Sequence, residues 1–408
     1  MNRKQVAFLA LIFSVAPSLA TANLLIDDGL DHLVTGAISE TVTMSNGSNL
    51  HVTTGGSIIG NGTSVGPLFA GGALEVDIPG PSHIRLDGDA IVSGGADRFA
   101  IARMYMGDLH IADNSVVNAG TSSYAIFGIG WSSFPQPPLL KTFLTERAFI
   151  NGSVRTDGLV SISDNAVING KLEESHSGID LEMNGGLITG RVRTGSLVGH
   201  SAIIRGGSIL GGYGGNASNI DFSMRGGRIA GGWFVNSREM DVEVHGGRID
   251  GGMSFGEMAD PFAHHSSINI FGGAFDATPG RWLLNFTSGL DFEGRTDFDC
   301  SSTDTIFNIW GGQFGYTASG SGLHLDLCAT IDIYGTNLSY SGGMLHGFLA
   351  DGSLLNLAVT EESRWSGQLR LHDVSVPEPG TLGLLGLALA AMVVAPRSAT
   401  GGRSHTAH

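Results

Sequence analysis

The chain has 408 residues, 42% of them hydrophobic, and its 63 glycines far outnumber its 12 prolines. This apolar share suffices for a sizeable core and excludes wholesale disorder, while the lack of a Gly-X-Y period and of abundant proline excludes collagen. The net charge of −16 argues against nucleic acid and anionic membrane surfaces as partners.

Residues 1–22 predict a secretory signal peptide. A basic start at Arg3 and Lys4 precedes an apolar run that ends at Val15, and the small-residue pattern ATA ends at Ala22. The alternative, a membrane-anchoring helix, would need a longer apolar run to cross a bilayer. We therefore expect export, with cleavage after Ala22.

A five-residue pattern recurs through the middle of the chain: apolar, any, apolar, any, glycine. Its glycines lie about 21 residues apart, with individual spacings between 17 and 26. The copies are LEMNG from Leu181, AIIRG from Ala202, FSMRG from Phe222, VEVHG from Val242, INIFG from Ile268, LDFEG from Leu290, FNIWG from Phe307 and IDIYG from Ile331.

Earlier copies carry other residues at the glycine position. In LHIADNSVVNAG from Leu109 and VSISDNAVINGK from Val160, Asp-Asn stands where later copies have Gly-Gly, and IRLDGDAIVSGG from Ile84 has Gly-Asp. Gly, Asn and Asp share a tolerance of positive φ. A phosphate-binding loop would require glycine, whereas a left-handed corner between strands accepts all three. The pattern therefore predicts a corner.

Apolar alternation, a tight corner and a return after about 20 residues predict one coil of a parallel β-helix. We expect an all-β, single-stranded, right-handed β-helix over residues 23–341, with about 20–22 residues per coil and about a dozen coils. A sandwich or a propeller is the rival architecture, but propeller blades need longer periods. Residues Trp131–Phe143 and Ser254–Ser267 are predicted to be loops that leave the rod.

The residue before each repeat glycine should point outward at the same place in every coil, since the apolar pair points inward. Aromatic rings there could bind sugar rings, which makes Phe271, Trp310 and Tyr334 candidate glycan-binding residues. The alternative is a ladder of rings that stabilises the rod. The full series is Asn184, Arg205, Arg225, His245, Phe271, Glu293, Trp310 and Tyr334.

The sequence contains little evidence for a catalytic site or a metal site. Carboxylates that could serve a polysaccharide-degrading enzyme gather between residues 291 and 304, but an acidic chain produces such clusters easily. His264-His265 is interpreted as part of a polar loop rather than a metal site, and Gly246–Gly252 lacks a calcium-binding nonapeptide. We expect no cofactor, metal or catalytic residue. The acidic cluster comprises Asp291, Glu293, Asp297, Asp299 and Asp304.

Cys300 and Cys328 are the two cysteines of the chain. In an exported protein such a pair can form a disulfide, but nothing in the sequence fixes the distance between them, and both states stay open.

The C-terminal residues contain a closing segment and a sorting signal. Residues 342–375 predict a strand-rich cap for the rod. In residues 376–408, the motif Pro377-Glu378-Pro379, an apolar run and a following Arg397 resemble the PEP-CTERM sorting segment. The resemblance implies a short hydrophobic helix that anchors the chain in the membrane, processing by an exosortase, and delivery to the cell surface or matrix, often alongside exopolysaccharide.

The same kind of segment is also described as an ice-binding protein C-terminal motif. An ice-binding face would require a regular outward threonine ladder, and the outward residues between the apolar pairs contain no threonine. We therefore predict an exported structural or adhesive protein of the cell surface or extracellular matrix, in contact with exopolysaccharide and without enzymatic activity. The alternative is a β-helix polysaccharide lyase or glycoside hydrolase, which an acidic groove along one face would favour.

Overall fold

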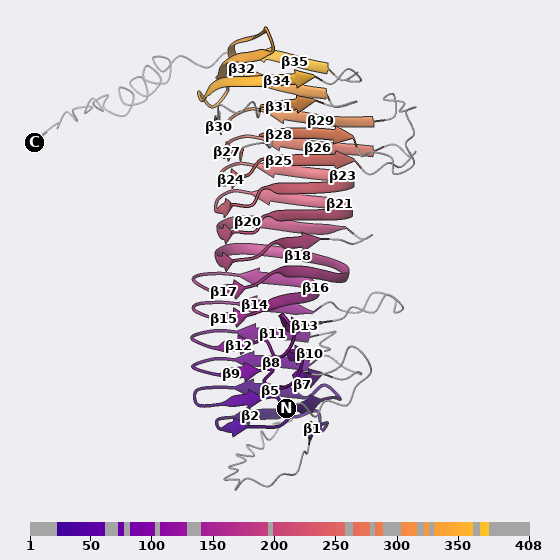
Figure 1. The fold of residues 1–408 in the computed structure, drawn as a ribbon, viewed down its shortest axis with the longest axis vertical. Helices are drawn as coiled ribbons and strands as arrows, with labels where there is room; N and C mark the ends of the chain where they lie inside the picture. Colours follow the sequence, from indigo (N-terminus) through magenta and orange to yellow (C-terminus); the bar gives the residue numbers. More distant parts are fainter. Residues whose placement is uncertain are drawn as a thin grey trace, which may run out of the picture.

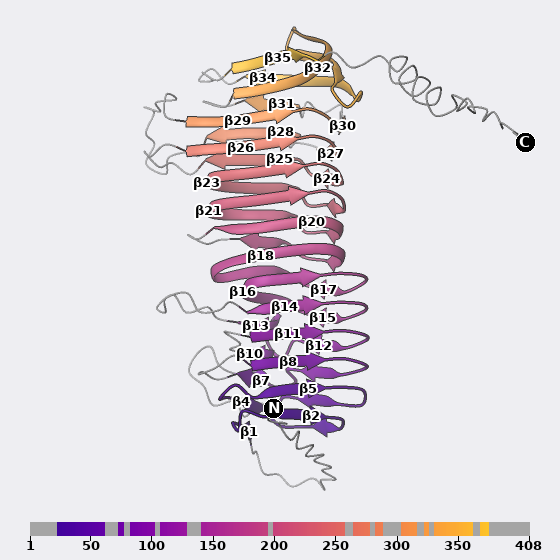
Figure 2. The ribbon, with the colours of Figure 1, turned by 180° about the vertical axis from the view of Figure 1, so that it is seen from behind.

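The computed structural model is a rod whose strands wind around a single axis (Figures 1 and 2). It describes residues 23–61, 72–76, 82–102, 107–128, 140–194, 199–257, 264–277, 282–288, 303–315, 322–325, 330–361 and 368–374. The predicted signal peptide and sorting segment lie outside these ranges. No helix in the described ranges is long and apolar enough to cross a membrane.

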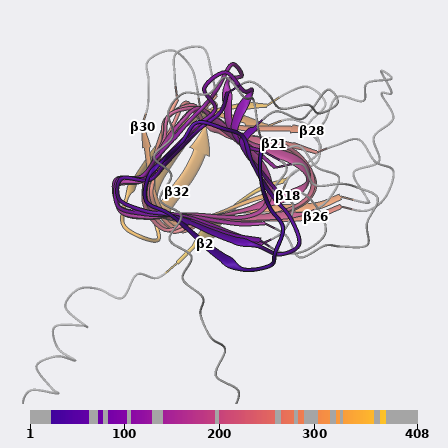
Figure 3. The ribbon, with the colours of Figure 1, turned by 90° about the horizontal axis from the view of Figure 1, so that it is seen from below.

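The rod has three faces and a roughly triangular cross-section (Figure 3). Each strand pairs in parallel with the strand one coil before it, so each face is a parallel sheet of stacked rungs. Face A contains β1 (Leu24–Ile26), β4 (Val42–Met44), β7 (Gly72–Val76), β10 (Phe99–Ala102), β13 (Tyr124–Phe127), β19 (Val192–Thr194), β25 (Met253–Glu257), β28 (Leu284–Ser288) and β31 (Leu323–Leu325).

Face B follows face A along the chain, and face C follows face B. Face B contains β2 (Asp31–Val34), β5 (Asn49–Val52), β8 (Ser82–Leu86), β11 (Gly107–Ile111), β14 (Lys141–Leu144), β26 (His264–Ile270), β29 (Thr303–Ile309), β32 (Thr330–Ser341) and β35 (Gln368–Asp373). Face C contains β3 (Ala37–Ile38), β6 (Ser57–Ile59), β9 (Ile91–Ser93), β12 (Val116–Asn118), β15 (Phe149–Asn151), β17 (Val167–Asn169), β22 (Arg228–Ile229), β24 (Arg248–Asp250), β27 (Ala274–Asp276) and β30 (Gln313–Gly315).

Five longer strands bend from one face to the next in the middle of the rod. Among them, β18 contributes a rung to all three faces. These strands are β16 (Ser153–Ile162), β18 (Leu172–Ile188), β20 (His200–Ile209), β21 (Tyr213–Met224) and β23 (Trp233–Val244). The predicted parallel β-helix is thus confirmed.

Period-2 alternation places the apolar pair of each repeat inside the rod. Val242 is 0% and Val244 is 1% exposed, and their partners in the coils on either side are equally buried. Nearly all buried hydrophobic residues join one continuous cluster along the axis. Because a single coil buries so little, each coil depends on its neighbours for a core.

The predicted left-handed corner lies between faces B and C. Gly247, the third residue after β23, has a φ of +91°, while Asp113 and Asp164, each the second residue after its face B strand, have φ of 56° and 55°. This corner varies little in length. From β5 to β17 the face C strand begins five residues after the face B strand ends, and from β21 to β30 it begins four residues after. The Asp-Asn copies therefore make the longer corner and the Gly-Gly copies the shorter one.

Coil length varies elsewhere. In the middle of the rod Leu181 pairs with Ala202, at the interval that the repeat predicts, whereas Ile268 pairs directly with Phe307 across a much longer stretch of chain. The predicted coil length therefore describes the middle of the rod. LDFEG from Leu290, predicted as a rung of its own, lies outside the described residues, and β26 and β29 pair directly with each other.

Both predicted loops are shorter than the sequence suggested. Residues Lys141–Leu144 form the rung β14, and most of Ser254–Ser267 belongs to β25 and β26. Low apolar content misled the prediction, because a rung needs only alternate apolar residues.

The C-terminal end of the rod differs from the coils. β33 (Met344–Leu349) and β34 (Leu354–Glu361) form an antiparallel hairpin, and β32 pairs antiparallel with β33. After this hairpin, β35 returns to face B and pairs in parallel with β32. The segment predicted as a cap therefore contains a hairpin and one further rung.

Candidate functional site

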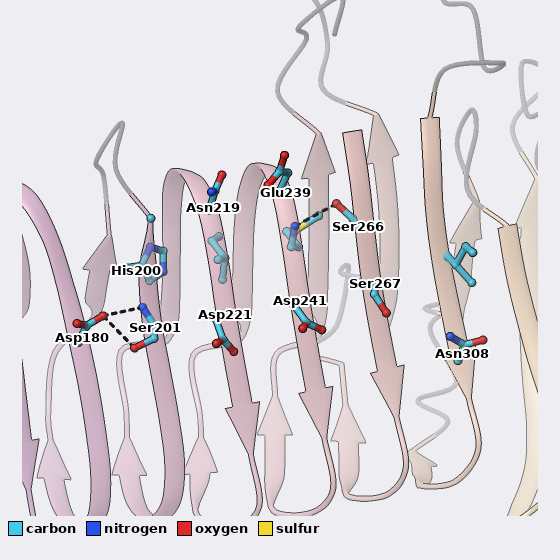
Figure 4. Close-up of a pocket in the computed structure, with 14 residues that line it drawn as sticks. Asp180, His200, Ser201, Asn219, Asp221, Glu239, Asp241, Ser266, Ser267 and Asn308 are labelled. Carbon is cyan, nitrogen blue, oxygen red and sulfur yellow. Dashed lines mark hydrogen bonds between the residues drawn. The ribbon is translucent and has the colours of Figure 1, made fainter. Parts of the chain in front are cut away.

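The outer surface of face B carries a groove of about 800 Å³ that crosses six successive rungs, from β18 to β29. Figure 4 shows Asp180, Ser201, Asp221, Asp241 and Ser267 in one row across these strands. The register explains the row, since these residues occupy equivalent positions in successive coils. Rungs are ~4.8 Å apart, so these five residues extend over ~19 Å along the axis.

We call this feature the acidic groove. Its row of outward side chains ends in the exposed Ile306, and a second row beside it contains Asn219 and Glu239. The residues that line it are Asp180, Gly199, His200, Ser201, Asn219, Ile220, Asp221, Glu239, Met240, Asp241, Ser266, Ser267, Ile306 and Asn308. Four of these are carboxylates and none is lysine or arginine.

The carboxylates of the acidic groove lie in different environments. Asp180 accepts hydrogen bonds from the Ser201 backbone NH at 3.0 Å and from its hydroxyl at 2.9 Å. Asp221 and Asp241 are direct register partners on β21 and β23. Partial burial and the negative charges of Asp221 and Glu243 raise the pKa of Asp241. The groove is therefore a region of unneutralised negative charge.

His200 lines the acidic groove beside Ser201 (Figure 4). It is only 4% exposed, and neither ring nitrogen has a hydrogen-bond partner. Burial lowers the pKa of His200 to about 4, against the opposing effect of the Asp180 charge. His200 is therefore neutral at physiological pH and has two hydrogen-bonding atoms without a partner among the described residues.

Beside the groove, near the corner with face C, outward rings form a second feature, the aromatic column. Its members are His245, Phe271, Trp310, Tyr334 and His372, one on each of five successive rungs. The sequence pattern missed His372, because β35 has no repeat glycine, and its member Glu293 lies outside the described residues. Without Glu293, the series from His245 to His372 has no interruption.

Rings of the aromatic column stack on one another. The Trp310 and Tyr334 ring centroids are 3.6 Å apart with planes 3° from parallel, and Tyr334 stacks on His372 at 4.6 Å. His245 stacks on Phe271 at 4.7 Å. Both faces of the Tyr334 ring are thus covered by neighbours, and a sugar would meet ring edges there. This geometry favours the ladder interpretation.

Side-chain hydrogen bonds connect the aromatic column to the acidic groove. The Tyr334 hydroxyl donates to Asn308 Oδ1 at 3.4 Å, and Asn308 Nδ2 donates to Asn269 Oδ1 at 2.9 Å. Asn269 Nδ2 in turn donates to Ser267 Oγ at 2.9 Å. The two features therefore form one continuous polar surface on the upper half of face B.

The remaining candidates either lie outside the described residues or fall on adjacent rungs of face B, where Asp304 is the register partner of His265. Asp291, Glu293, Asp297, Asp299, Cys300, Cys328 and the motif Pro377-Glu378-Pro379 lie outside the described residues. Asp304 belongs to β29, and His264 and His265 begin β26. Within the described ranges, no group of three or more His, Cys, Asp or Glu residues is placed to hold a metal ion.

The acidic groove itself was not predicted. Its signal was present in the residue that precedes each apolar pair, which is Asp180, Ser201, Asp221, Asp241 and Ser267 in successive copies. The position before the glycine carries aromatic side chains in several copies, which indicates a function, whereas a mixed Asp/Ser series resembles an ordinary solvated edge.

Comparison with known protein families identifies the C-terminal sorting signal. Residues 375–398 match the PEP-CTERM protein-sorting motif, as the Pro-Glu-Pro sequence predicted. Comparison with curated proteins and with solved structures found no match. The chain therefore combines a parallel β-helix with the sorting motif of exported cell-surface proteins that an exosortase processes.

Proposed function

We propose that the protein is a non-enzymatic structural or adhesive component of the cell surface or extracellular matrix, and that it binds exopolysaccharide along the acidic groove. The observation that carries this proposal is the alignment of the groove with the rod axis over six rungs. A polysaccharide laid along the axis would meet an equivalent polar position at every rung. Many weak, equally spaced contacts give avidity without a deep pocket.

A rigid rod suits this role. The continuous core and the parallel ladders keep the groove straight, so the protein supplies a preorganised surface and loses little conformational entropy on binding. The sorting motif would bring this surface to the place where exopolysaccharide accumulates.

Binding of the full-length protein to exopolysaccharide fractions, measured by co-sedimentation, tests the proposal. Ser201→Phe together with Ser267→Phe places two bulky side chains in the groove without a charge change and should reduce binding at least tenfold. The control is Ser93→Phe, an outward position of β9 on face C, which should bind like the wild type. Equal binding by the groove variant and the wild type would contradict the proposed site.

One observation favours a second candidate, glycoside hydrolysis. Asp221 and Asp241 are neighbours in register, and the raised pKa of Asp241 suits a general acid beside an ionised partner. An assay for new reducing ends on the same polysaccharides separates the two functions. Binding without release of reducing sugar supports adhesion, whereas release that Asp241→Asn abolishes supports the enzyme.

A further inference from the structure

We propose that the acidic groove selects polysaccharides whose sugars carry free amino groups, such as partly de-N-acetylated hexosamine polymers. The inference rests on the proposed function, since it names the class of glycan that this groove binds. Two observations carry it: the charge of the row of side chains, and the spacing of its carboxylates along the rod axis.

The charge of the groove decides against uronic-acid polymers. Four of its lining residues are carboxylates, and no lysine or arginine lines it. An anionic sugar chain would meet like charges at Asp180, Asp221 and Asp241 with no cation to compensate. A protonated amine would instead form charge-assisted hydrogen bonds, which are about twice as strong as neutral ones.

The spacing of the carboxylates supports a repeating cation. Asp221 and Asp241 lie on adjacent rungs, and Asp180 lies two rungs before Asp221. The rung spacing of ~4.8 Å is comparable to the length of one sugar unit in an extended chain. An amine on successive sugars would therefore reach a carboxylate at most rungs of this part of the groove.

Besides burial, the raised pKa of Asp241 also reflects the negative charge gathered in the acidic groove. Partial burial and the nearby charges of Asp221 and Glu243 make its ionised form unfavourable in the free protein. A bound cation would reduce the repulsion between the Asp241 carboxylate and its negative neighbours. This relief of repulsion would contribute to the binding free energy.

His200 adds no charge to the groove. Both of its ring nitrogens are buried, and neither has a hydrogen-bond partner among the described residues. A protonated histidine would repel a cationic sugar. The burial that keeps this ring neutral is therefore compatible with an amino-sugar ligand.

The test compares two oligosaccharides that share one backbone: a glucosamine oligomer and its fully N-acetylated form. The measurement is calorimetry on the full-length protein at about pH 6. The amino oligomer should bind at least tenfold more tightly than the acetylated one, and oligogalacturonate should bind most weakly. Asp221→Asn with Asp241→Asn should weaken the amino oligomer at least tenfold and change the acetylated one by less than about twofold.

The control variant is Asp113→Asn with Asp164→Asn. It removes two negative charges, as the groove variant does, but at the corner between faces B and C. Asparagine tolerates the left-handed conformation of both positions. It should bind like the wild type. An equal loss in this control would show unspecific charge attraction and overturn the inference.

The failures of the two proposals are distinguishable. If both glucosamine oligomers bind equally and the groove variant does not change this, the amino-sugar selectivity is wrong while exopolysaccharide binding survives. If no oligosaccharide or exopolysaccharide fraction binds, the proposed function itself is wrong.

Discussion

At the scale of single residues, the aromatic column shows how one side chain can have two interpretations. Outward rings at regular spacing are typical both of glycan-binding platforms and of ladders that stabilise a repeat protein. The decisive observation is that the Tyr334 ring stacks on Trp310 at 3.6 Å and on His372 at 4.6 Å between centroids, because a ring covered on both sides has no free face to offer. Stacked pairs contribute about 0.5–1.5 kcal/mol beyond the area they bury.

Replacement of Trp310 and Tyr334 by alanine should therefore lower stability and leave glycan binding nearly unchanged. We expect a loss of about 2 kcal/mol in the free energy of unfolding, measured with urea, because both rings are only partly buried. Phe143→Ala is the control for binding, since this ring stacks on His110 in a separate pair on face B. Loss of glycan binding with unchanged stability would instead identify the column as the glycan platform.

The buried His200 makes a pH-dependent contribution to stability. In the unfolded chain its pKa is about 6.5, whereas burial lowers it to about 4 in the fold, so the unfolded state binds the proton first. Stability is therefore lost as the pH falls from 6.5 toward 4, by up to about 3 kcal/mol from this residue.

His200→Leu should remove this share of the acid destabilisation, as measured by urea unfolding at neutral and acidic pH. The matched control is His346→Leu, at an exposed position of β33, which should behave like the wild type in the same comparison. An unchanged acid loss in the His200 variant would show that the destabilisation arises elsewhere.

At the scale of the elements, the corner between faces B and C determines the register of each coil. Its φ values are positive, so glycine, asparagine and aspartate are favoured there. In the Gly-Gly copies the space is also restricted: a Cβ on Gly247 would lie 2.6 Å from Met224 Cε and 2.8 Å from Gly226 O.

Gly247→Ala should consequently destabilise the rod by about 2–3 kcal/mol, through both strain and contact. Gly36→Ala is the control, since its φ is not positive and a Cβ there would meet nothing within 4 Å. Thermal unfolding of the two variants provides the measurement. Equal melting temperatures would mean that the corner adapts to a side chain.

The elements also show what the sequence could predict. Alternation and corner residues were sufficient for the rungs from β18 to β26, because each copy pairs with the next at a nearly constant interval. The pattern did not predict that β26 would pair directly with β29, since strand pairing depends on what lies beside a segment in space. The acidic groove escaped prediction for a related reason: its charge becomes visible only when side chains that are a full coil apart in the sequence are brought into one row.

At the scale of the whole molecule, stability is distributed along the axis. Each coil contacts mainly the coils before and after it, so a local defect should open nearby rungs rather than the entire rod. The hairpin of β33 and β34 protects the C-terminal end, where Leu355 and Leu357 are each 1% exposed.

Leu357→Lys places a charge in this buried position and should lower the local stability by about 3 kcal/mol. Hydrogen exchange followed by mass spectrometry should then show faster exchange in β31 to β35 and unchanged exchange in β5 to β12. Asn356→Lys, at the exposed neighbouring position, should behave like the wild type. A uniform increase along the rod would contradict local opening.

The nearly constant corner between faces B and C has a consequence for how such a chain can grow. The coil that leads from Ile268 to Phe307 is far longer than the coil that leads from Asp31 to Asn49, while this corner keeps nearly the same span in the regular coils. The chain that precedes face B can therefore vary in length, whereas the corner that follows face B cannot. An inserted peptide or a small domain placed between β25 and β26 would be carried outside the rod without a change of register. The number of coils and the length of the loops can therefore change independently. The fold can thus display loops of different lengths on rods of different lengths.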